Sequence, residues 1–189
     1  MLEKNDKIMF YKYLDNATVY FEYGSGGSTY QASKRHNIQK IYSVESDLEW
    51  HNKLKEILPN HCIINFIFNE MYTKPKTLEH PGPNSTHDQW KNYSNQFLLL
   101  EEYEKKYIDL ILIDGRFRVA CCLKIFNYIS NNCVIAFDDF LNRTYYHTIL
   151  DYYDIIEKTQ DNRMVILKKK NNVSSIDNAL IEKYELISS

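Results

Sequence analysis

Three observations predict one α/β domain with a doubly wound, mostly parallel sheet. Short apolar runs alternate with amphipathic stretches along the chain. This alternation is typical of βαβ units, whose right-handed crossovers place helices on both faces of a sheet. A glycine cluster at 24–27 separates the first apolar run from the first amphipathic stretch, as in sheets of this kind. The length of 189 residues suits a single domain spanning 1–189.

Six apolar runs predict the strands. They are rich in β-branched and aromatic residues, which fit a pleated and partly buried surface. The run at 109–113 is almost wholly apolar, which is typical of a strand covered on both faces. The predicted strands are 18–22, 41–44, 62–68, 109–113, 133–137 and 163–168.

Helical spacing of apolar residues predicts the connecting helices. Ser28 or Thr29 is expected to start the first helix, since Ser and Thr favour N-caps, and Pro59 to stop the second. The predicted helices are 28–36, 47–58, 119–129, 141–158 and 176–187.

One polar segment interrupts the alternation. Residues 72–97 contain Pro75, Pro81 and Pro83 and are too many for an ordinary connection. We expect a lid or a substrate-binding loop there, the alternative being a surface insertion without a role.

The composition argues against several classes of protein. With 23 Lys+Arg against 25 Asp+Glu, the net charge of -2 gives no reason to expect nucleic acid or a membrane as partner. No apolar run approaches the roughly 20 residues that cross a bilayer, and the charged first residues lack a signal-peptide core. The four cysteines show no CxxC pair, so we expect buried, reduced thiols in a cytoplasmic protein, with homo-oligomerisation left open.

The strongest motif is the stretch from Glu22 to Thr29, which follows a predicted strand and opens a helix. Glycines there allow a sharp turn and close approach of a ligand. The stretch lacks the Gly-Lys-Ser/Thr of a P-loop, and Thr29 stands where a dinucleotide fingerprint has its third glycine. Glu45 ends the next strand, where an acid accepts hydrogen bonds from ribose hydroxyls. The pair predicts a site for an adenosine-containing ligand.

Glu22-x-Gly24-x-Gly26, followed by Val44-Glu45, resembles the first two motifs of class I S-adenosylmethionine-dependent methyltransferases. The resemblance covers about residues 17–169. It implies a Rossmann-like, mostly parallel sheet of seven strands whose last strand is antiparallel, with helices on both faces. It also implies S-adenosylmethionine as the cofactor.

Residue roles follow from the resemblance. Glu22 and Gly24 are expected near the methionyl amine and carboxylate, and Glu45 at the ribose. Ser46 or Asp47 is expected beside the adenine, with Asn69 and Glu70 as further candidates. The predicted cofactor-binding residues are Glu22, Gly24, Ser25, Gly26, Gly27, Glu45 and Ser46.

Carboxylates follow two further strands. Asp114 ends the strand at 109–113, and Asp138 and Asp139 end the strand at 133–137. These ends meet at one crevice, where clustered carboxylates repel unless protons or a cation neutralise them. The arrangement resembles metal-dependent small-molecule O-methyltransferases, including those acting on sugars, and implies Mg²⁺ or Mn²⁺ held by these three residues. The alternative is that arginines pair with Asp114 and that Asp138 or Asp139 caps a helix.

Candidate catalytic groups flank the aspartates. Asp114, Arg116 and His147 are the predicted catalytic residues, with His147 as a general base because its ordinary pKa lies near neutrality. The alternative is that His147 is packed. Arg116, Arg118 and Arg143 favour an anionic acceptor, since arginine forks suit phosphate and carboxylate.

The resulting hypothesis is O-methylation of a small polar acceptor, such as a sugar or nucleotide-sugar hydroxyl. Two rival hypotheses stay open. The first is another nucleotide-dependent enzyme, such as an NAD oxidoreductase. The second is a methyltransferase-like module that binds a ligand without catalysis, since a fold alone does not establish activity.

Overall fold

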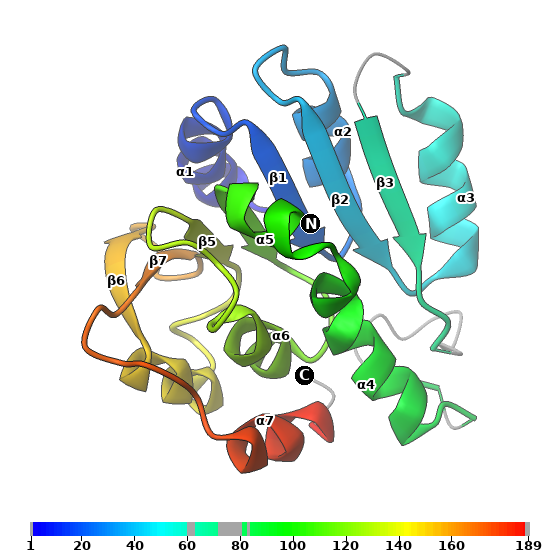
Figure 1. Ribbon diagram of the computed structural model, residues 1–189. Coiled ribbons are helices and arrows are strands. Elements are labelled where there is room, and N and C mark those ends of the chain that lie inside the picture. Colours follow the sequence, from blue (N-terminus) through cyan, green and yellow to red (C-terminus); the bar gives the residue numbers. More distant parts are fainter. Residues whose placement is uncertain (1, 60–62, 72–80, 83, 188–189) are drawn as a thin grey trace.

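A sheet of seven strands runs through the middle of the protein (Figure 1). The computed structural model describes residues 2–59, 63–71, 81–82 and 84–187. The strands lie in the order β3-β2-β1-β4-β5-β7-β6. β1 to β5 are parallel, and β7 is antiparallel to both β5 and β6. The strands are β1 Val19–Tyr23, β2 Lys40–Glu45, β3 Ile63–Phe68, β4 Leu110–Ile113, β5 Val134–Phe137, β6 Tyr153–Lys158 and β7 Val165–Lys169.

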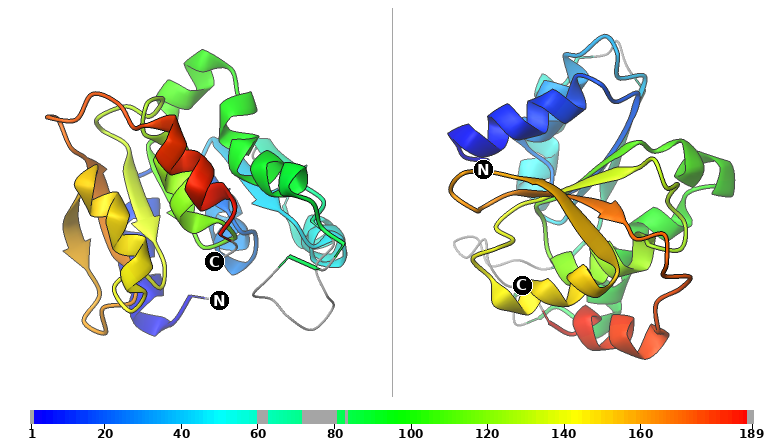
Figure 2. Two further views of the ribbon diagram at one scale, coloured as in Figure 1. Left: turned by 90° about the horizontal axis from the view of Figure 1, so that it is seen from below. Right: turned by 90° about the vertical axis from the view of Figure 1, so that its left-hand side faces the viewer.

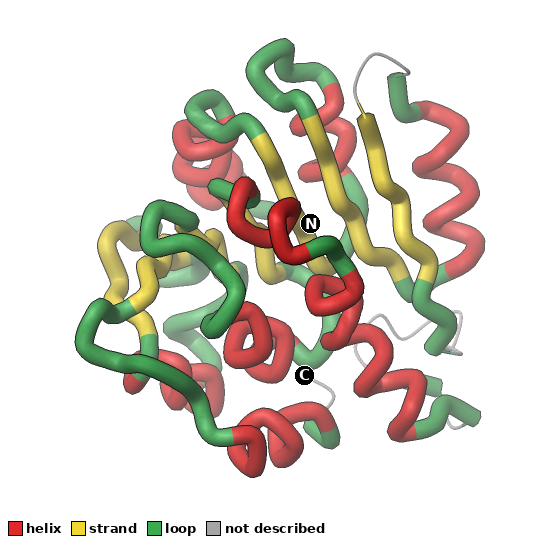
Figure 3. Tube along the Cα trace, in the orientation of Figure 1, coloured by secondary structure: helices red, strands yellow, loops and turns green. Residues whose placement is uncertain are grey.

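Helices cover both faces of this sheet (Figure 3), which confirms the predicted fold class. None of the helices in the described ranges has the length and apolar character needed to cross a membrane. The α-helices are α1 Lys4–Leu14, α2 Gly27–Ser33, α3 Leu48–Ile57, α4 His87–Asn95, α5 Glu102–Tyr107, α6 Arg118–Ile125 and α7 Asn178–Glu185, and the 3₁₀-helices are η1 Gln96–Leu99 and η2 Thr144–Asp151.

Alternate residues of each strand build two separate cores, because successive side chains of a strand point to opposite faces. On one face Ile111 and Ile113 pack with side chains of α4, α6 and α7. On the other face Leu110 and Leu112 pack with side chains of α1 and α2. Figure 2 shows α1 on one side of the sheet and α6 with α7 on the other.

The helix predicted for 141–158 is wrong in its second half. The segment forms η2 and then β6, which pairs with β7 at the sheet edge. The exposure of β6 alternates along its length from the buried Tyr153. This period of two matches an edge strand, and Ile155 and Ile156 suit it because β-branched residues favour strands.

The segment 72–97 is a helix in its latter part. Residues 72–80 and 83 lie outside the described residues. Thr86 and Gln89 form a capping box at the start of α4, and Tyr93 and Phe97 then enter the core at helical spacing. The described part of the predicted lid is therefore built into the fold.

Candidate functional site

The loops after β1 and β4 touch through two glycines. Gly24 has φ +94, and a Cβ atom there would lie 2.8 Å from backbone atoms of Asp114 and Gly115. A Cβ atom on Gly115 would lie 2.9 Å from the Gly24 nitrogen and 2.1 Å from the hydroxyl of Tyr93 in α4. Glycine is required at Gly24 by both conformation and space, so the predicted cofactor loop is fixed against the end of β4.

Glu22 lies beneath this loop and is fully buried. Its Oε1 accepts hydrogen bonds from Thr29 and from the Ser43 hydroxyl at 2.7 Å. Its Oε2 accepts hydrogen bonds from the Tyr20 hydroxyl at 2.7 Å and the Ser28 hydroxyl at 2.6 Å. Burial raises the pKa of Glu22, and the Ser28, Thr29, Ser43 and Tyr20 donors oppose that rise. Four donors fill the acceptor positions of the carboxylate, so this geometry suits a group that positions the loop and differs from the expected contact with a ligand amine.

Thr29 explains why the loop has no third glycine. Its Oγ1 accepts the Gly26 N–H at 2.9 Å and donates to Glu22. The hydroxyl thereby ties the loop backbone to the buried carboxylate. Ser25 adds a second tie, because its hydroxyl lies 2.6 Å from the Ser43 hydroxyl.

Glu45 ends β2 beside this loop and is 8% exposed. Its Oε1 accepts the backbone N–H groups of Ser46 at 2.6 Å and Asp47 at 2.8 Å. Its Oε2 receives only one long hydrogen bond among the described residues, from the Ser25 N–H at 3.3 Å. Burial raises the pKa of Glu45 to about 7, and the backbone donors limit the rise. One acceptor position on Oε2 is therefore open toward the loop.

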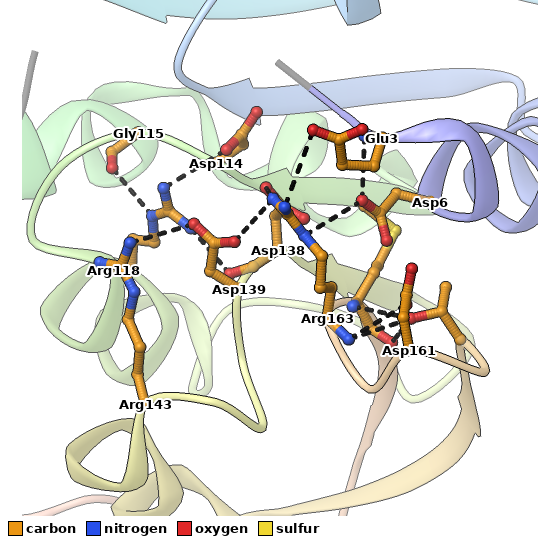
Figure 4. Close-up of polar contacts among 12 residues, drawn as sticks. Glu3, Asp6, Asp114, Gly115, Arg118, Asp138, Asp139, Arg143, Asp161 and Arg163 are labelled. Atoms are coloured by element: carbon orange, nitrogen blue, oxygen red, sulfur yellow. Dashed lines mark hydrogen bonds and ion pairs between the residues drawn. The ribbon is translucent and has the colours of Figure 1, made fainter.

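The aspartates after β4 and β5 lie among arginines (Figure 4). Arg118 lies 3.4 Å from carboxylate oxygens of both Asp114 and Asp139 and donates to the Asp138 carbonyl at 2.7 Å. Asp139 also accepts hydrogen bonds from Arg143 at 3.1 Å and Arg163 at 2.8 Å. Asp139 has φ +57, a left-handed conformation that is rare outside glycine. Three guanidinium groups thus surround one carboxylate.

Asp114 and Asp138 follow the neighbouring parallel strands β4 and β5, and the Asp114 charge acts on Asp138. Burial raises the pKa of both groups, and the charges of Asp114 and Asp139 raise that of Asp138 further. Arg118 lowers the pKa of both. Asp114 is held by an ion pair with Arg118, whereas the buried Oδ1 of Asp138 has no hydrogen-bond partner among the described residues.

The sequence did not point to Arg163 or α1 as parts of this crevice. Arg163 lies 3.6 Å from Asp6, 3.8 Å from Glu3 and 3.9 Å from Asp138 (Figure 4). Asp6 is fully buried, and burial raises its pKa. The capping box formed by Glu3 and Asp6 is the local signal that marks the start of α1.

Neither a protein-family model nor a curated protein sequence matches the chain. Solved structures do match. A methyltransferase-like protein from Silicibacter pomeroyi has a TM-score of 0.80 at 22% identity, over 97% of this chain and 93% of its own. The chain has the class I S-adenosylmethionine-dependent methyltransferase fold.

Two more distant structures share this methyltransferase fold. An rRNA methylase from Streptococcus thermophilus has a TM-score of 0.54 at 11% identity, over 89% of this chain and 99% of its own. A TehB-like SAM-dependent methyltransferase from Corynebacterium glutamicum has a TM-score of 0.52 at 9% identity, over 90% of this chain and 89% of its own.

The predicted metal site does not fit the residues present. The described residues contain no group of three His, Cys, Asp or Glu side chains that could hold a metal ion. Both oxygens of Asp139 bind arginines, and burial with the charges of Asp114 and Asp139 raises the pKa of Asp138 to about 7. Arginines therefore neutralise these carboxylates where Mg²⁺ or Mn²⁺ was expected.

The remaining predicted residues have different surroundings. The Arg116 N–H lies 3.4 Å from the Tyr93 hydroxyl, which links the loop after β4 to α4. The His147 ring lies 5.4 Å from the Phe140 ring, and its buried Nε2 has no hydrogen-bond partner among the described residues. The side-chain amide of Asn69 binds Gln89 and Gln96. No hydrogen bond or ion pair in the described part of the chain joins His147 to the aspartates, and its role as a general base stays a prediction.

Proposed function

We propose that the chain is an S-adenosylmethionine-dependent methyltransferase that acts on a hydroxyl of a small polar acceptor. The observation that carries the proposal is Glu45, a buried acid at the end of β2 with an open acceptor position facing the Gly24–Gly27 loop. A buried carboxylate with an unfilled position is costly unless a ligand donor completes it. A ribose hydroxyl is such a donor.

The loop residues and Glu45 hold the cofactor in this proposal. Ser25, Gly26 and Gly27 provide backbone without bulky side chains, and an added Cβ at Gly27 would meet no atom within 4 Å. Glu45 orients the ribose, with Ser46 beside it. When bound, S-adenosylmethionine supplies a methyl group on a positively charged sulfur, which an oxygen nucleophile accepts.

Asp114 is the proposed proton acceptor on the other side of the crevice. The acceptor oxygen forms its bond to the methyl carbon, the bond from that carbon to sulfur breaks with its electron pair on sulfur, and the hydroxyl proton goes to Asp114. Burial and the charge of Asp139 support this role, because both raise the pKa of Asp114. Arg118 holds Asp114 in place at 3.4 Å. Alignment and charge placement then supply the rate enhancement, without a metal ion.

A sugar or nucleotide-sugar hydroxyl remains the proposed acceptor. Arg143 keeps 37% of its side chain exposed beside Asp139 and offers donors to a polar or anionic group. Nucleic acid is disfavoured by the net charge of -2 and by the pairing of Arg118 and Arg163 with carboxylates. The buried free thiols of Cys121, Cys122 and Cys133 suit a reducing, cytoplasmic setting.

Calorimetric titration of S-adenosylhomocysteine into the protein tests the cofactor assignment. We expect micromolar affinity that falls at least tenfold in Glu45→Gln, since a hydrogen bond to a charged group contributes about 1.5–3 kcal/mol. Glu49→Gln on α3 is the matched control, because Glu49 is exposed and pairs with Lys53. Equal affinity of the parent for NAD, or no binding of S-adenosylhomocysteine, would refute the assignment.

A methyl-transfer screen tests the acceptor class. Sugars, nucleotide-sugars, phenols and RNA are incubated with protein and methyl-labelled S-adenosylmethionine. Label in a sugar fraction that Asp114→Asn abolishes supports the proposal. Label in RNA alone would overturn the acceptor class, and cofactor binding without transfer to any acceptor would favour the binding module.

A further inference from the structure

Trp50 in the first turn of α3 lies against the glycine loop. Its indole Nε1 donates a hydrogen bond to the Ser25 carbonyl at 3.0 Å. Ring atoms of Trp50 lie 3.9 Å from the point where a Cβ of Gly26 would stand. The lack of a side chain at Gly26 therefore leaves a gap between the ring and the loop backbone.

The same few residues connect this ring to Glu45. The Ser25 N–H faces Glu45 Oε2 at 3.3 Å, while the Ser25 carbonyl binds the Trp50 indole. The Trp50 N–H donates to the Asp47 carboxylate at 2.8 Å, and the Asp47 N–H donates to Glu45. Trp50 is thus fixed at both its backbone and its ring to groups that surround the proposed ribose position.

The exposure of Trp50 is unusual for so well anchored an aromatic ring. It is 44% exposed, although large aromatic side chains gain most when they are buried. An anchored, half-exposed indole beside the polar groups of Ser25 and Glu45 provides an apolar wall for a ligand that has one flat and one polar side. Adenosine has this shape.

We propose that Trp50 contacts the adenosine half of the bound cofactor. This inference rests on the proposed function, because it places the cofactor at Glu45 and the glycine loop. The indole ring forms an apolar wall of the site, and its N–H holds the Ser25 carbonyl so that the Ser25 N–H keeps its orientation toward Glu45. Trp50 is a binding residue in this account and takes no part in methyl transfer.

Tryptophan fluorescence tests the contact directly, because the chain has two tryptophans. In Trp90→Phe the emission comes from Trp50 alone, and in Trp50→Phe it comes from Trp90 alone. We expect S-adenosylhomocysteine and 5′-methylthioadenosine to change the intensity or wavelength of Trp50 emission. Free methionine should not change it, since methionine lacks the adenosine half.

Affinities of variants give the second measurement. By calorimetry, Trp50→Ala should bind S-adenosylhomocysteine about tenfold more weakly, since the variant loses both the aromatic contact and the anchoring hydrogen bond. Trp50→Phe retains a ring without the anchor and should lose less. Circular dichroism verifies that both variants are folded, and the fluorescence test leaves Trp50 itself intact.

Two negative results have distinct meanings. If the parent binds S-adenosylhomocysteine but Trp50 emission stays unchanged at saturation and Trp50→Ala binds with the parental affinity, the inference is wrong and the proposed function stands. If the parent does not bind S-adenosylhomocysteine at all, the proposed function and the inference fail together.

Discussion

Without ligand, the stability of Glu45→Gln relative to the parent protein should increase as the pH rises. Burial raises the pKa of Glu45 from 4.5 to about 7, so the unfolded chain loses this proton at a lower pH than the native protein does. Between these two values the native state binds more protons, and the free energy of unfolding falls with rising pH. Glutamine has no proton to lose, so the variant lacks this contribution.

The magnitude follows from the two pKa values. The whole shift corresponds to about 3 kcal/mol, and about 2.5 kcal/mol of it falls between pH 5 and pH 8. Glutamine keeps an acceptor for the Ser46 and Asp47 N–H groups but turns an amide toward the Ser25 N–H. That mismatch changes the free energy of unfolding of the variant by an amount that does not depend on pH, so it cancels when values at different pH are compared.

Urea unfolding of parent and variant at pH 5, 6, 7 and 8 measures the effect. The free energy of unfolding of Glu45→Gln minus that of the parent should rise steadily through this range and level off above pH 7. Asp138 also titrates abnormally, but it is present in both proteins and is removed by subtraction. A difference that stays flat from pH 5 to pH 8 contradicts the reasoning, because Glu45 would then have an ordinary pKa.

Three other changes test the loop and the aspartate cluster. In thermal unfolding, Gly24→Ala should lower the stability of the protein by about 2–4 kcal/mol, because the new Cβ meets backbone atoms at 2.8 Å and φ is +94. Gly27→Ala has open space at its Cβ, so its stability in the same measurement should lie within about 1 kcal/mol of the parent. Thr29→Val should cost about 1–3 kcal/mol in urea unfolding, since the Gly26 N–H loses its acceptor, and unchanged stability would exclude this tie. EDTA should leave methyl transfer unaltered in a labelled-methyl assay, because arginines occupy Asp139; activity restored by added Mg²⁺ would show the opposite.

The positions of six strands along the chain could be predicted from local patterns, because each pattern has a local cause, whereas the seven-stranded sheet was implied by the resemblance. Buried strands such as 109–113 need apolar residues on both faces, and the loop at Gly24 needs a positive φ. Glu45 could be placed beside that loop because parallel strands share one carboxyl edge. The edge strand β6 was missed, since it lies at the border of the sheet and mixes apolar with charged residues.

The partners of the aspartates could not be read from the sequence. Asp6 and Arg163 come from opposite ends of the chain, and their approach depends on how α1 packs beneath the sheet. Three carboxylates at two strand ends are compatible with a metal ion and with arginines alike. Only the directions of the side chains distinguish these two kinds of partner. Glu22 gives the same lesson, because the four hydroxyls that fill its carboxylate come from β1, α2 and β2.

The contacts of α1 also fix the order in which the protein can be completed during synthesis. This helix leaves the ribosome before β6 and β7, yet Lys12 pairs with Glu157, Asn5 with Asp161 and Asp6 with Arg163. Contacts between such distant residues form late and slow folding, because a long loop must close first. The contacts of α1 therefore form only after β6 and β7 are made. A nascent chain without these strands contains the glycine loop after β1, but its proposed acceptor site is incomplete.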